Sequence, residues 1–416
     1  MCIRDRNISG RWNLDEEVFF QPIKKIVSHA ALKLSYSLTG DRGPGLSNST
    51  AIIASSSPFR PFTSVQESGL ILSTLGNDEL TYEKKTEFNL GIDLGFLENR
   101  INVAMDVYTR DNHDLIGTTR TQGVGGEIAK FANIASMKSH GFELSVSSNN
   151  IKTKDFSWNT DFIYSIYKNE GTDLNAIATT MDYVSGTGFT MVGYPHRGLF
   201  SIPFAGLDSN GIPMFYNEKG EITSTDLSFQ SSDDFSWLKY EGPTEPTFTG
   251  SLGNSFTYKN VHLNVFFTYS GGNVVRLDPV FSYRYSDLTA TTREFKNRWM
   301  VPGDENRTNV PTILSYRQYY ENAELRNAYS AYNYSTERVA KGGFIRLKEI
   351  SVAYDFPKKW LSALKVSNVS LKLQATNLCL LYADKKLNGQ DPEFVNSGGV
   401  ASPVPRQFTM TLRLGL

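Results

Sequence analysis

The sequence predicts an all-β protein, an antiparallel transmembrane β-barrel wall of about eleven strands. Apolar and polar residues alternate with period two along many short segments, as in strands that have one apolar face. The links between these segments are short and long in strict turn. No apolar run approaches the roughly 18 residues of a membrane-spanning helix, whereas a barrel strand requires only the alternation.

The alternating segments follow one another along the chain. The clearest is 88–96, where apolar residues from Phe88 to Phe96 alternate with small or polar residues such as Asn89 and Asp93. A turn at 98–100 connects this segment to the next one. The expected strands lie near 8–14, 32–38, 88–96, 101–107, 142–146, 158–166, 248–258, 261–269, 350–356, 369–373 and 408–416.

The links between strands predict a membrane orientation. Short links are expected at 98–100, 148–155 and 259–260, with a compact link of helical character at 357–367. Long links are expected at 40–80, 112–130, 169–245, 271–341 and 383–405. A soluble sandwich has no reason to sort its links in this way. An outer-membrane barrel does, because its periplasmic turns are short and its extracellular loops are long.

The two faces of the predicted strands suit two different surroundings. The apolar residues of 88–96 would meet lipid, since a closed barrel pairs every backbone polar group within the bilayer. The alternate positions would face water in the lumen, and they include Asn89, Asp93, Asn102, Asp106, Glu143 and Asp161.

Aromatic residues are abundant, with 26 Phe, 21 Tyr and 5 Trp in a chain of polar mean hydropathy. Outer-membrane barrels carry aromatic girdles at both membrane interfaces. Residues expected at or near strand ends are Tyr36, Tyr82, Tyr108, Trp158, Tyr258, Tyr269 and Tyr354. The alternative is that these residues pack a soluble β core, which is the commoner use of aromatic side chains. The alternation of short and long links favours the interpretation of these residues as membrane-interface girdles.

Composition argues against several other classes of protein. The 416 residues carry a net charge of −1 and no block of Lys or Arg, which argues against a nucleic-acid partner. Cys2 and Cys379 cannot form a disulfide scaffold. The five histidines lack the spacing of a zinc site, and no nucleophile elbow or phosphate loop is present. We therefore expect a protein that is not an enzyme and uses no metal or cofactor.

The first six residues do not share the pattern of the rest. Residues 1–6 contain no apolar core of a secretory signal and resemble a translated adapter sequence, so we treat 1–6 as an artefact outside the fold. The native N-terminus and any targeting signal would then lie upstream of this chain.

Seven stretches, in the same order, resemble the C-terminal half of SusC/RagA-type TonB-linked outer-membrane transporters of Bacteroidetes. The first is ELTYEKKTEFNLGIDLGF at 79–96, continued by LENRINVAMDVY, in which Tyr82 stands where the family usually has Trp. The others are GFEL (141–144), GYPHRGLF with GLDSNGIP (193–200 and 206–213), EGPTEPTFTGSLGNSFTYKN (241–260), RWMVPGDENRTNVP (298–311), GGFIRLKEISVAYDFPKKW (342–360), and DPEF with PRQFTMTLRLGL (391–394 and 405–416).

This resemblance implies that residues 7–416 form the C-terminal half of a 22-stranded barrel, whose plug and other N-terminal regions are not in the chain. Such proteins lie in the cell outer membrane of Gram-negative bacteria, in contact with its lipid. They import glycan fragments or peptides with energy from the TonB complex, which acts on the N-terminal region. A SusD-like surface lipoprotein covers the barrel as a lid.

Four aromatic residues in the long links are the candidate substrate contacts. Sugars stack on aromatic faces, and polar neighbours indicate exposed loop positions for Trp237, Tyr240, Tyr285 and Trp299. The alternative for each is local packing within a loop. Two further functions stay open at this point: a passive porin or adhesin barrel, and a soluble β-rich glycan-binding protein.

Overall fold

The computed structural model describes most of the chain. The described residues are 5–42, 52–56, 65–66, 68–74, 77–123, 128–227, 229, 234–280, 291–361, 366–395 and 405–415. Residues 1–4 of the expected artefact lie outside these ranges, while Arg6 begins the first strand.

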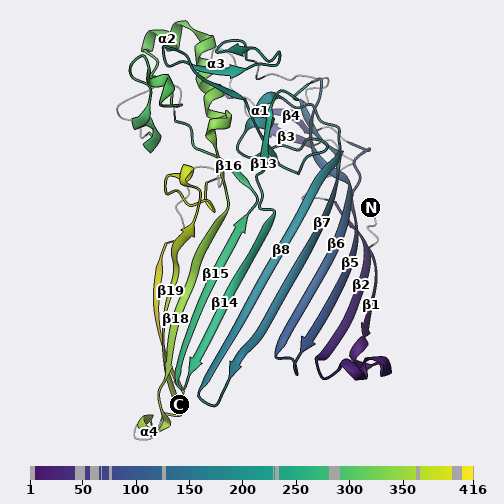
Figure 1. Cartoon of the computed structure of the whole chain (residues 1–416). Coiled ribbons are helices and arrows are strands. Elements are labelled where there is room, and N and C mark those ends of the chain that lie inside the picture. Colours follow the sequence, from purple (N-terminus) through teal and green to yellow (C-terminus); the bar gives the residue numbers. More distant parts are fainter. Residues whose placement is uncertain are drawn as a thin grey trace.

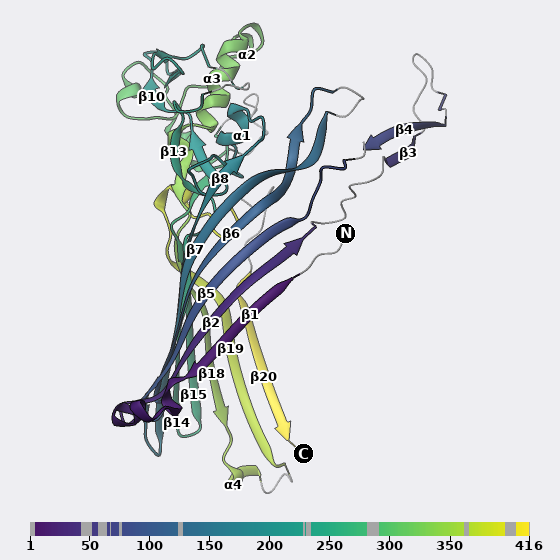
Figure 2. The ribbon, with the colours of Figure 1, turned by 90° about the vertical axis from the view of Figure 1, so that its right-hand side faces the viewer.

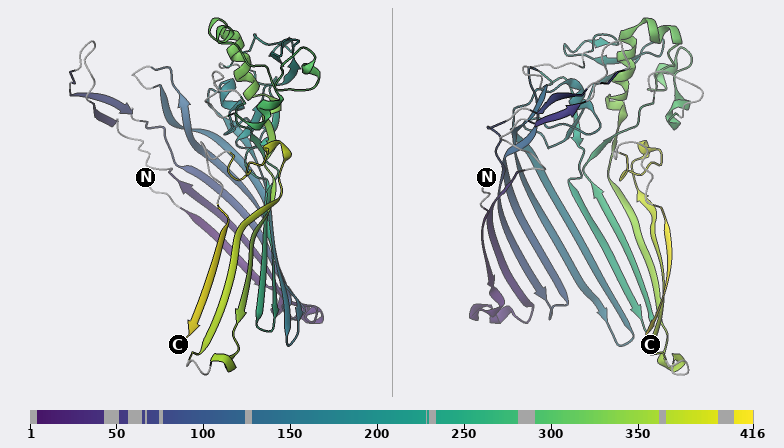
Figure 3. Two further views of the ribbon diagram at one scale, coloured as in Figure 1. Left: turned by 90° about the vertical axis from the view of Figure 1, so that its left-hand side faces the viewer. Right: turned by 180° about the vertical axis from the view of Figure 1, so that it is seen from behind.

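One antiparallel sheet of eleven strands dominates the structure, and its strand order follows the chain (Figure 1). This confirms the predicted fold class and strand count. The strands are β1 (Arg6–Asn13), β2 (Val27–Asp41), β5 (Glu83–Phe96), β6 (Ile101–Arg120), β7 (Ala129–Lys152), β8 (Phe156–Leu174), β14 (Phe248–Tyr258), β15 (Val261–Gly271), β18 (Phe344–Asp355), β19 (Asn368–Tyr382) and β20 (Gln407–Gly415). The sheet is twisted and curved, as barrel walls are (Figures 2 and 3).

Smaller elements gather at one end of the large sheet (Figure 1). The short strands are β3 (Ile52–Ser56), β4 (Gly69–Thr74), β9 (Gly198–Ser201), β10 (Phe204–Leu207), β11 (Pro213–Tyr216), β12 (Ile222–Thr223), β13 (Lys239–Pro243), β16 (Val274–Arg276) and β17 (Val339–Lys341). Helices α1 (Thr180–Val184), α2 (Tyr316–Glu321) and α3 (Ala323–Asn333) lie at this end, while α4 (Lys358–Leu361) lies at the opposite end. Within the described ranges, no helix has the length and apolar character needed to cross a membrane.

The links are sorted between the two ends of the sheet as predicted. At one end, residues 97–100, 153–155 and 259–260 and the segment containing α4 connect neighbouring strands. The 14–26 link, with 3-10 helices at Leu14–Glu16 and Val18–Ile23, is also at this end. The links at the other end include the two longest, which together carry β9 to β13, β16, β17 and α1 to α3.

The long link expected at 112–130 is wrong in extent. Strand β6 continues to Arg120 and β7 begins at Ala129, so most of this segment is paired strand. The apolar alternation ends near Val107 because the continuing strands no longer have an apolar face to maintain. A register shift between Asn112 and Leu115, with Asp114 in the left-handed region at φ 58°, further obscures the pattern.

Strand register places the apolar residues on one face. Leu34 lies opposite Leu90, which lies opposite Val107, and the same row continues through Phe142, Ile166 and Phe248. The next row on the other face runs through Lys33, Gly91, Asp106, Glu143, Ser165 and Thr249. Directly opposite residues share a face, so the sheet has one apolar and one polar surface, as predicted.

The apolar face remains largely uncovered. Phe408 is 78% exposed and Met410 is 71% exposed, and Leu373 beside them is 53% exposed. Among the buried hydrophobic residues that the structure describes, the large sheet contributes only Ala30, Ala31 and Tyr108. A soluble β protein buries one face of its sheet, whereas this sheet presents large side chains outward as a lipid-facing wall does. Along β5 the face spans the eight steps from Phe88 to Phe96, about 26 Å.

Aromatic residues gather where the strands meet the short links. The rings of Trp158 and Phe256 stack at 5.7 Å, and those of Tyr354 and Phe356 meet edge to face at 5.1 Å. The indole Nε1 of Trp158 donates to Asn254 Oδ1 at 2.9 Å. Rings with one polar group suit the membrane interface, so these residues fit the predicted girdle.

Tyr108 does not belong to this girdle. It lies in the middle of β6 and is only 7% exposed. Its register partners are Asn89 and Gly141, so it is on the polar face. A Cβ added at Gly141 would approach the Tyr108 ring to 2.4 Å, so the glycine makes room for the ring. Prediction placed Tyr108 at a strand end because the alternation stops there and the strand does not.

Candidate functional site

The polar face of the sheet forms the first part of the site. The six residues predicted to line the lumen lie on this face by register: Asn89, Asp93, Asn102, Asp106, Glu143 and Asp161. Several are held by neighbouring strands: Lys33 Nζ lies 2.8 Å from Asp93 Oδ1, and Ser147 Oγ donates to Asp161 Oδ1 at 2.7 Å. A charged, hydrogen-bonded surface of this kind suits a water-filled passage.

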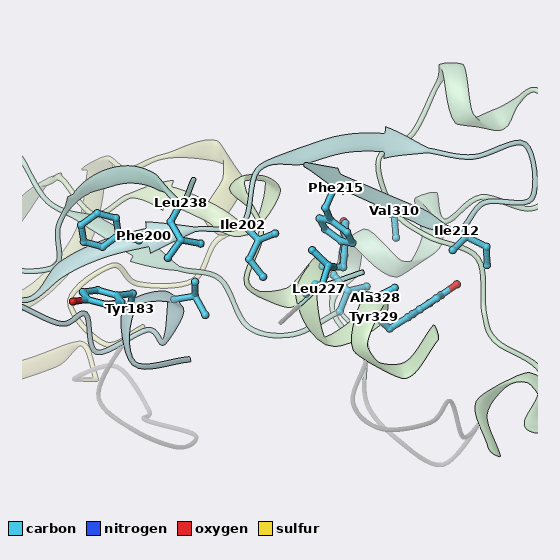
Figure 4. Close-up of a cluster of buried hydrophobic side chains, with 14 of the residues drawn as sticks. Tyr183, Phe200, Ile202, Ile212, Phe215, Leu227, Leu238, Val310, Ala328 and Tyr329 are labelled. Atoms are coloured by element: carbon cyan, nitrogen blue, oxygen red, sulfur yellow. The ribbon is translucent and has the colours of Figure 1, made fainter. Parts of the chain in front are cut away.

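The described parts of the two longest links fold into a unit above β8, β14, β15 and β18. We call it the external unit (residues 175–227, 229, 234–247, 272–280 and 291–343; Figure 1). It has its own hydrophobic core, drawn in Figure 4, in which Phe200, Ile202 and Phe215 are at most 1% exposed. Helix α3 turns Ala328, Tyr329, Ala331 and Tyr332 toward this core. The helix starts at Asn322, whose side chain accepts from Leu325 N at 3.1 Å, as N-cap residues do.

Arg276 joins distant parts of the external unit. It is 7% exposed, and its guanidinium donates to Ser201 Oγ and to the carbonyl oxygens of Ser335, Val184 and Phe200 at 2.7 to 3.1 Å. Burial lowers the pKa of Arg276 to about 10, so the group stays charged at neutral pH. These four acceptors come from segments up to 92 residues away in the chain, so one side chain organises the unit.

Two of the four candidate substrate residues help to form the core of the external unit. Tyr240 packs against Tyr194 and Phe200, with ring centroids 4.8 and 5.3 Å away, and burial raises its pKa to about 12. Trp237 packs against the same core, and its buried Nε1 has no hydrogen-bond partner among the described residues. Both side chains are half-buried, which differs from the exposed positions expected from their polar neighbours.

The other two candidate substrate residues are Trp299 and Tyr285. Trp299 is half-buried beside Gly211, where a Cβ would approach its ring to 2.5 Å, and its Nε1 donates to Glu305 at 2.9 Å. Tyr285 lies outside the described residues. The structure brings Trp237 and Tyr240 to one cluster, while Trp299 packs around a separate turn.

A further part of the site was not predicted. After β19 the chain turns back, and Asp391 of the DPEF stretch meets Arg346 Nη2 at 2.6 Å, with Glu393 at 3.1 Å. Arg346 lies opposite Thr268 on the polar face and is 5% exposed. These ion pairs therefore hold the 383–395 segment against the polar face of the sheet. Both partners lie in stretches that resemble known transporters, but neither their pairing nor its burial can be read from spacing.

We expect Asp391→Asn to release this segment, because it leaves the buried Arg346 with only the more exposed Glu393 as partner. Breaking a buried ion pair typically costs about 3 kcal/mol. Hydrogen exchange of 384–395 in the intact protein should become faster. The matched control is Glu393→Gln, whose side chain is 43% exposed and should have little effect. Equal exchange in wild type and Asp391→Asn would contradict this role.

Among the described residues, no three His, Cys, Asp or Glu side chains gather into a group that could hold a metal ion.

A wall with one apolar and one polar face, and a folded unit over one end, defines an integral outer-membrane β-barrel protein. The chain is 26% identical over 407 residues to TonB-dependent receptor P3 of Formosa agariphila, covering 92% of this chain. It is 27% identical over 439 residues to TonB-dependent receptor SusC of Bacteroides thetaiotaomicron, covering 97% of this chain. Along more than nine-tenths of its length, the chain is therefore similar to TonB-dependent receptors that include SusC.

Solved structures share the fold. The RagAB peptide transporter superimposes with a TM-score of 0.76 at 22% identity, over 99% of this chain and 43% of the transporter chain. No protein-family model matches the sequence. The chain spans only 37% of the length of receptor P3 and 39% of that of SusC.

Proposed function

We propose that this chain is the wall and external mouth of a TonB-dependent importer of oligosaccharides or peptides. The observation that carries the proposal is similarity along more than nine-tenths of the chain to receptors that include SusC. The polar face, which meets the 383–395 segment through Arg346, provides a surface along which a hydrophilic solute can pass. The protein transports its solute unchanged and is not an enzyme.

The proposal includes regions and partners beyond these residues. Residues 7–416 are the C-terminal half of the barrel, residues 1–6 are an artefact, and plug and TonB-contacting regions precede them in the full protein. The TonB complex supplies energy through that N-terminal region. A SusD-like surface lipoprotein rests on the external unit, which lies at the end opposite the short links.

The four aromatic residues remain proposed solute contacts, and the structure supports them unequally. Trp237 packs against the aromatic core and its Nε1 is buried, so only the uncovered part of its ring can meet a solute. Tyr240 and Trp299 can likewise contact a solute only through the uncovered parts of their rings. The proposal for Tyr285 is supported only by its neighbours in the sequence. If Trp237→Ala and Trp299→Ala, made in the intact receptor, leave solute affinity and uptake unchanged, these contacts are wrong.

Energy dependence tests the proposed function. We expect cells that express the intact receptor to take up its solute only while TonB is present. Deleting TonB should reduce uptake to the level of cells without the receptor. Uptake that continues without TonB would instead indicate a passive porin and would contradict the proposal.

A further inference from the structure

We propose that a cavity between the external unit and the 383–395 segment binds a carboxylate group of the transported solute. The cavity has a volume of about 360 Å³, within the range of small-molecule sites. This inference rests on the proposed import function and names the chemical class of solute. The cavity lies outside the aromatic cluster around Tyr240 and shares no lining residue with the four aromatic candidates.

Four stretches of chain surround the cavity. Leu277 and Asp278 follow β16, Thr291 to Glu294 lead into a 3-10 helix (Arg293–Asn297), Arg338 precedes β17, and Lys386 to Gln390 follow β19. Side chains join the stretches across it: Asn388 Nδ2 donates to Glu294 Oε1 at 2.8 Å, and Gln390 Nε2 donates to Asp278 Oδ2 at 2.7 Å. The walls are therefore held in place before any solute arrives, which lowers the entropic cost of binding.

The charges around the cavity favour an anion. The lining has three cations, Arg293, Arg338 and Lys386, against the carboxylates of Asp278 and Glu294. Glu294 is already paired with Arg338, which is 3% exposed. Arg293 and Lys386 have no carboxylate within 4.0 Å among the described residues, and the Lys386 ammonium makes only a long contact of 3.4 Å to Val339 O. Among the described residues, the cavity thus contains two cations without a carboxylate partner, Arg293 and Lys386. It contains one carboxylate without a cationic partner in the same ranges, that of Asp278.

Asp278 and Arg293 can bind a solute carboxylate together with the polar groups that lie next to it. The Asp278 carboxylate can accept a hydroxyl or amide hydrogen of the solute, while Arg293 can form two parallel hydrogen bonds to its acidic group. Both uronate-containing oligosaccharides and acidic peptides carry this combination. The shared feature is a carboxylate next to hydrogen-bond donors.

The cavity is also placed where a solute would enter. Gln390 lines it, and the next residue, Asp391, is bound to Arg346 on the polar face. A solute held here contacts both the external unit and the segment that is fastened to the wall. Binding would therefore occur at the junction of the mouth and the passage.

The test compares affinities in the purified intact receptor. The probes are a galacturonate trisaccharide with its neutral galactose counterpart, and the peptide Asp-Ala-Asp with Asn-Ala-Asn. We expect one acidic probe to bind at least tenfold more tightly than its neutral partner, and Arg293→Gln combined with Lys386→Gln to remove that preference. The matched control Lys296→Gln changes an exposed cation of the same 3-10 helix outside the cavity and should keep it.

The pair of probes that shows the preference identifies the source of the carboxylate. Absence of a preference in both pairs, or a preference that survives in the double variant, overturns this proposal. If TonB-dependent uptake of a neutral solute persists in that case, the import function stands while the carboxylate site is wrong. Loss of TonB dependence would instead remove the import function itself.

Discussion

Leu144→Arg is expected to prevent most of the receptor from assembling in the membrane. Leu144 lies on the apolar face of β7, between Phe142 and Val146, and opposite Met105. A guanidinium at this depth of a barrel wall costs about 2–4 kcal/mol on the lipid side. The assembled fraction, measured by heat-modifiable migration of the intact receptor from membranes, should fall severalfold, and urea unfolding in vesicles should show the same loss of free energy.

The matched control is Ser145→Arg. Ser145 is the next residue of the same strand, lies opposite Ala104, and faces the polar side. The same guanidinium can remain in water there, so the assembled fraction should stay near that of wild type. Equal losses in the two variants would contradict the assignment of the two faces.

Arg276→Met is expected to loosen the external unit while leaving the wall intact. The substitution removes the donors to Ser201, Ser335, Val184 and Phe200 and leaves their oxygens buried. Hydrogen bonds from a charged group contribute about 1.5–3 kcal/mol, and the unsatisfied acceptors add to the loss. We therefore expect local unfolding of the unit to become at least tenfold more frequent, visible as faster hydrogen exchange in 180–202 and 328–340.

Two further variants separate charge from geometry. Arg276→Lys retains the charge but cannot reach all four acceptors, so its exchange should be intermediate. Arg317→Met removes an arginine whose side chain is 83% exposed and forms a surface ion pair with Glu321, and exchange should stay unchanged. If Arg276→Met exchanged as slowly as wild type, the organising role of this residue would be wrong.

Period-two alternation was enough to locate the eleven strands of the sheet, because a wall between lipid and water needs a different residue on each face. Because the alternation arises only where a strand separates lipid from water, predictions that rely on it fail elsewhere. Strands β6 and β7 continue beyond the apolar face, and there the residues no longer need to alternate between apolar and polar. The length of these strands and the position of Tyr108 were therefore mispredicted. Strands outside the apolar band have no comparable signature.

The external unit was beyond sequence reasoning for a different reason. Its core pairs residues far apart in the chain, such as Phe204 with Tyr332, whose rings lie 5.8 Å apart. Polar neighbours of Trp237 suggested exposure, but local context does not report which distant side chains cover a ring. The ion pair of Arg346 with Asp391 joins residues 45 apart and shows no periodicity either.

The central claim is that β5 separates lipid from water along 88–96, and spin labels on the intact receptor test it directly. Labels would be placed one at a time on cysteines at each position from 88 to 96, with Cys379 and every other native cysteine of the intact receptor replaced by serine. Collision with oxygen, which concentrates in lipid, should peak at Phe88, Leu90, Ile92 and Leu94, and collision with a water-soluble nickel complex should peak at the residues between them. Accessibility without this period of two, or with the two reagents in phase, would contradict the account.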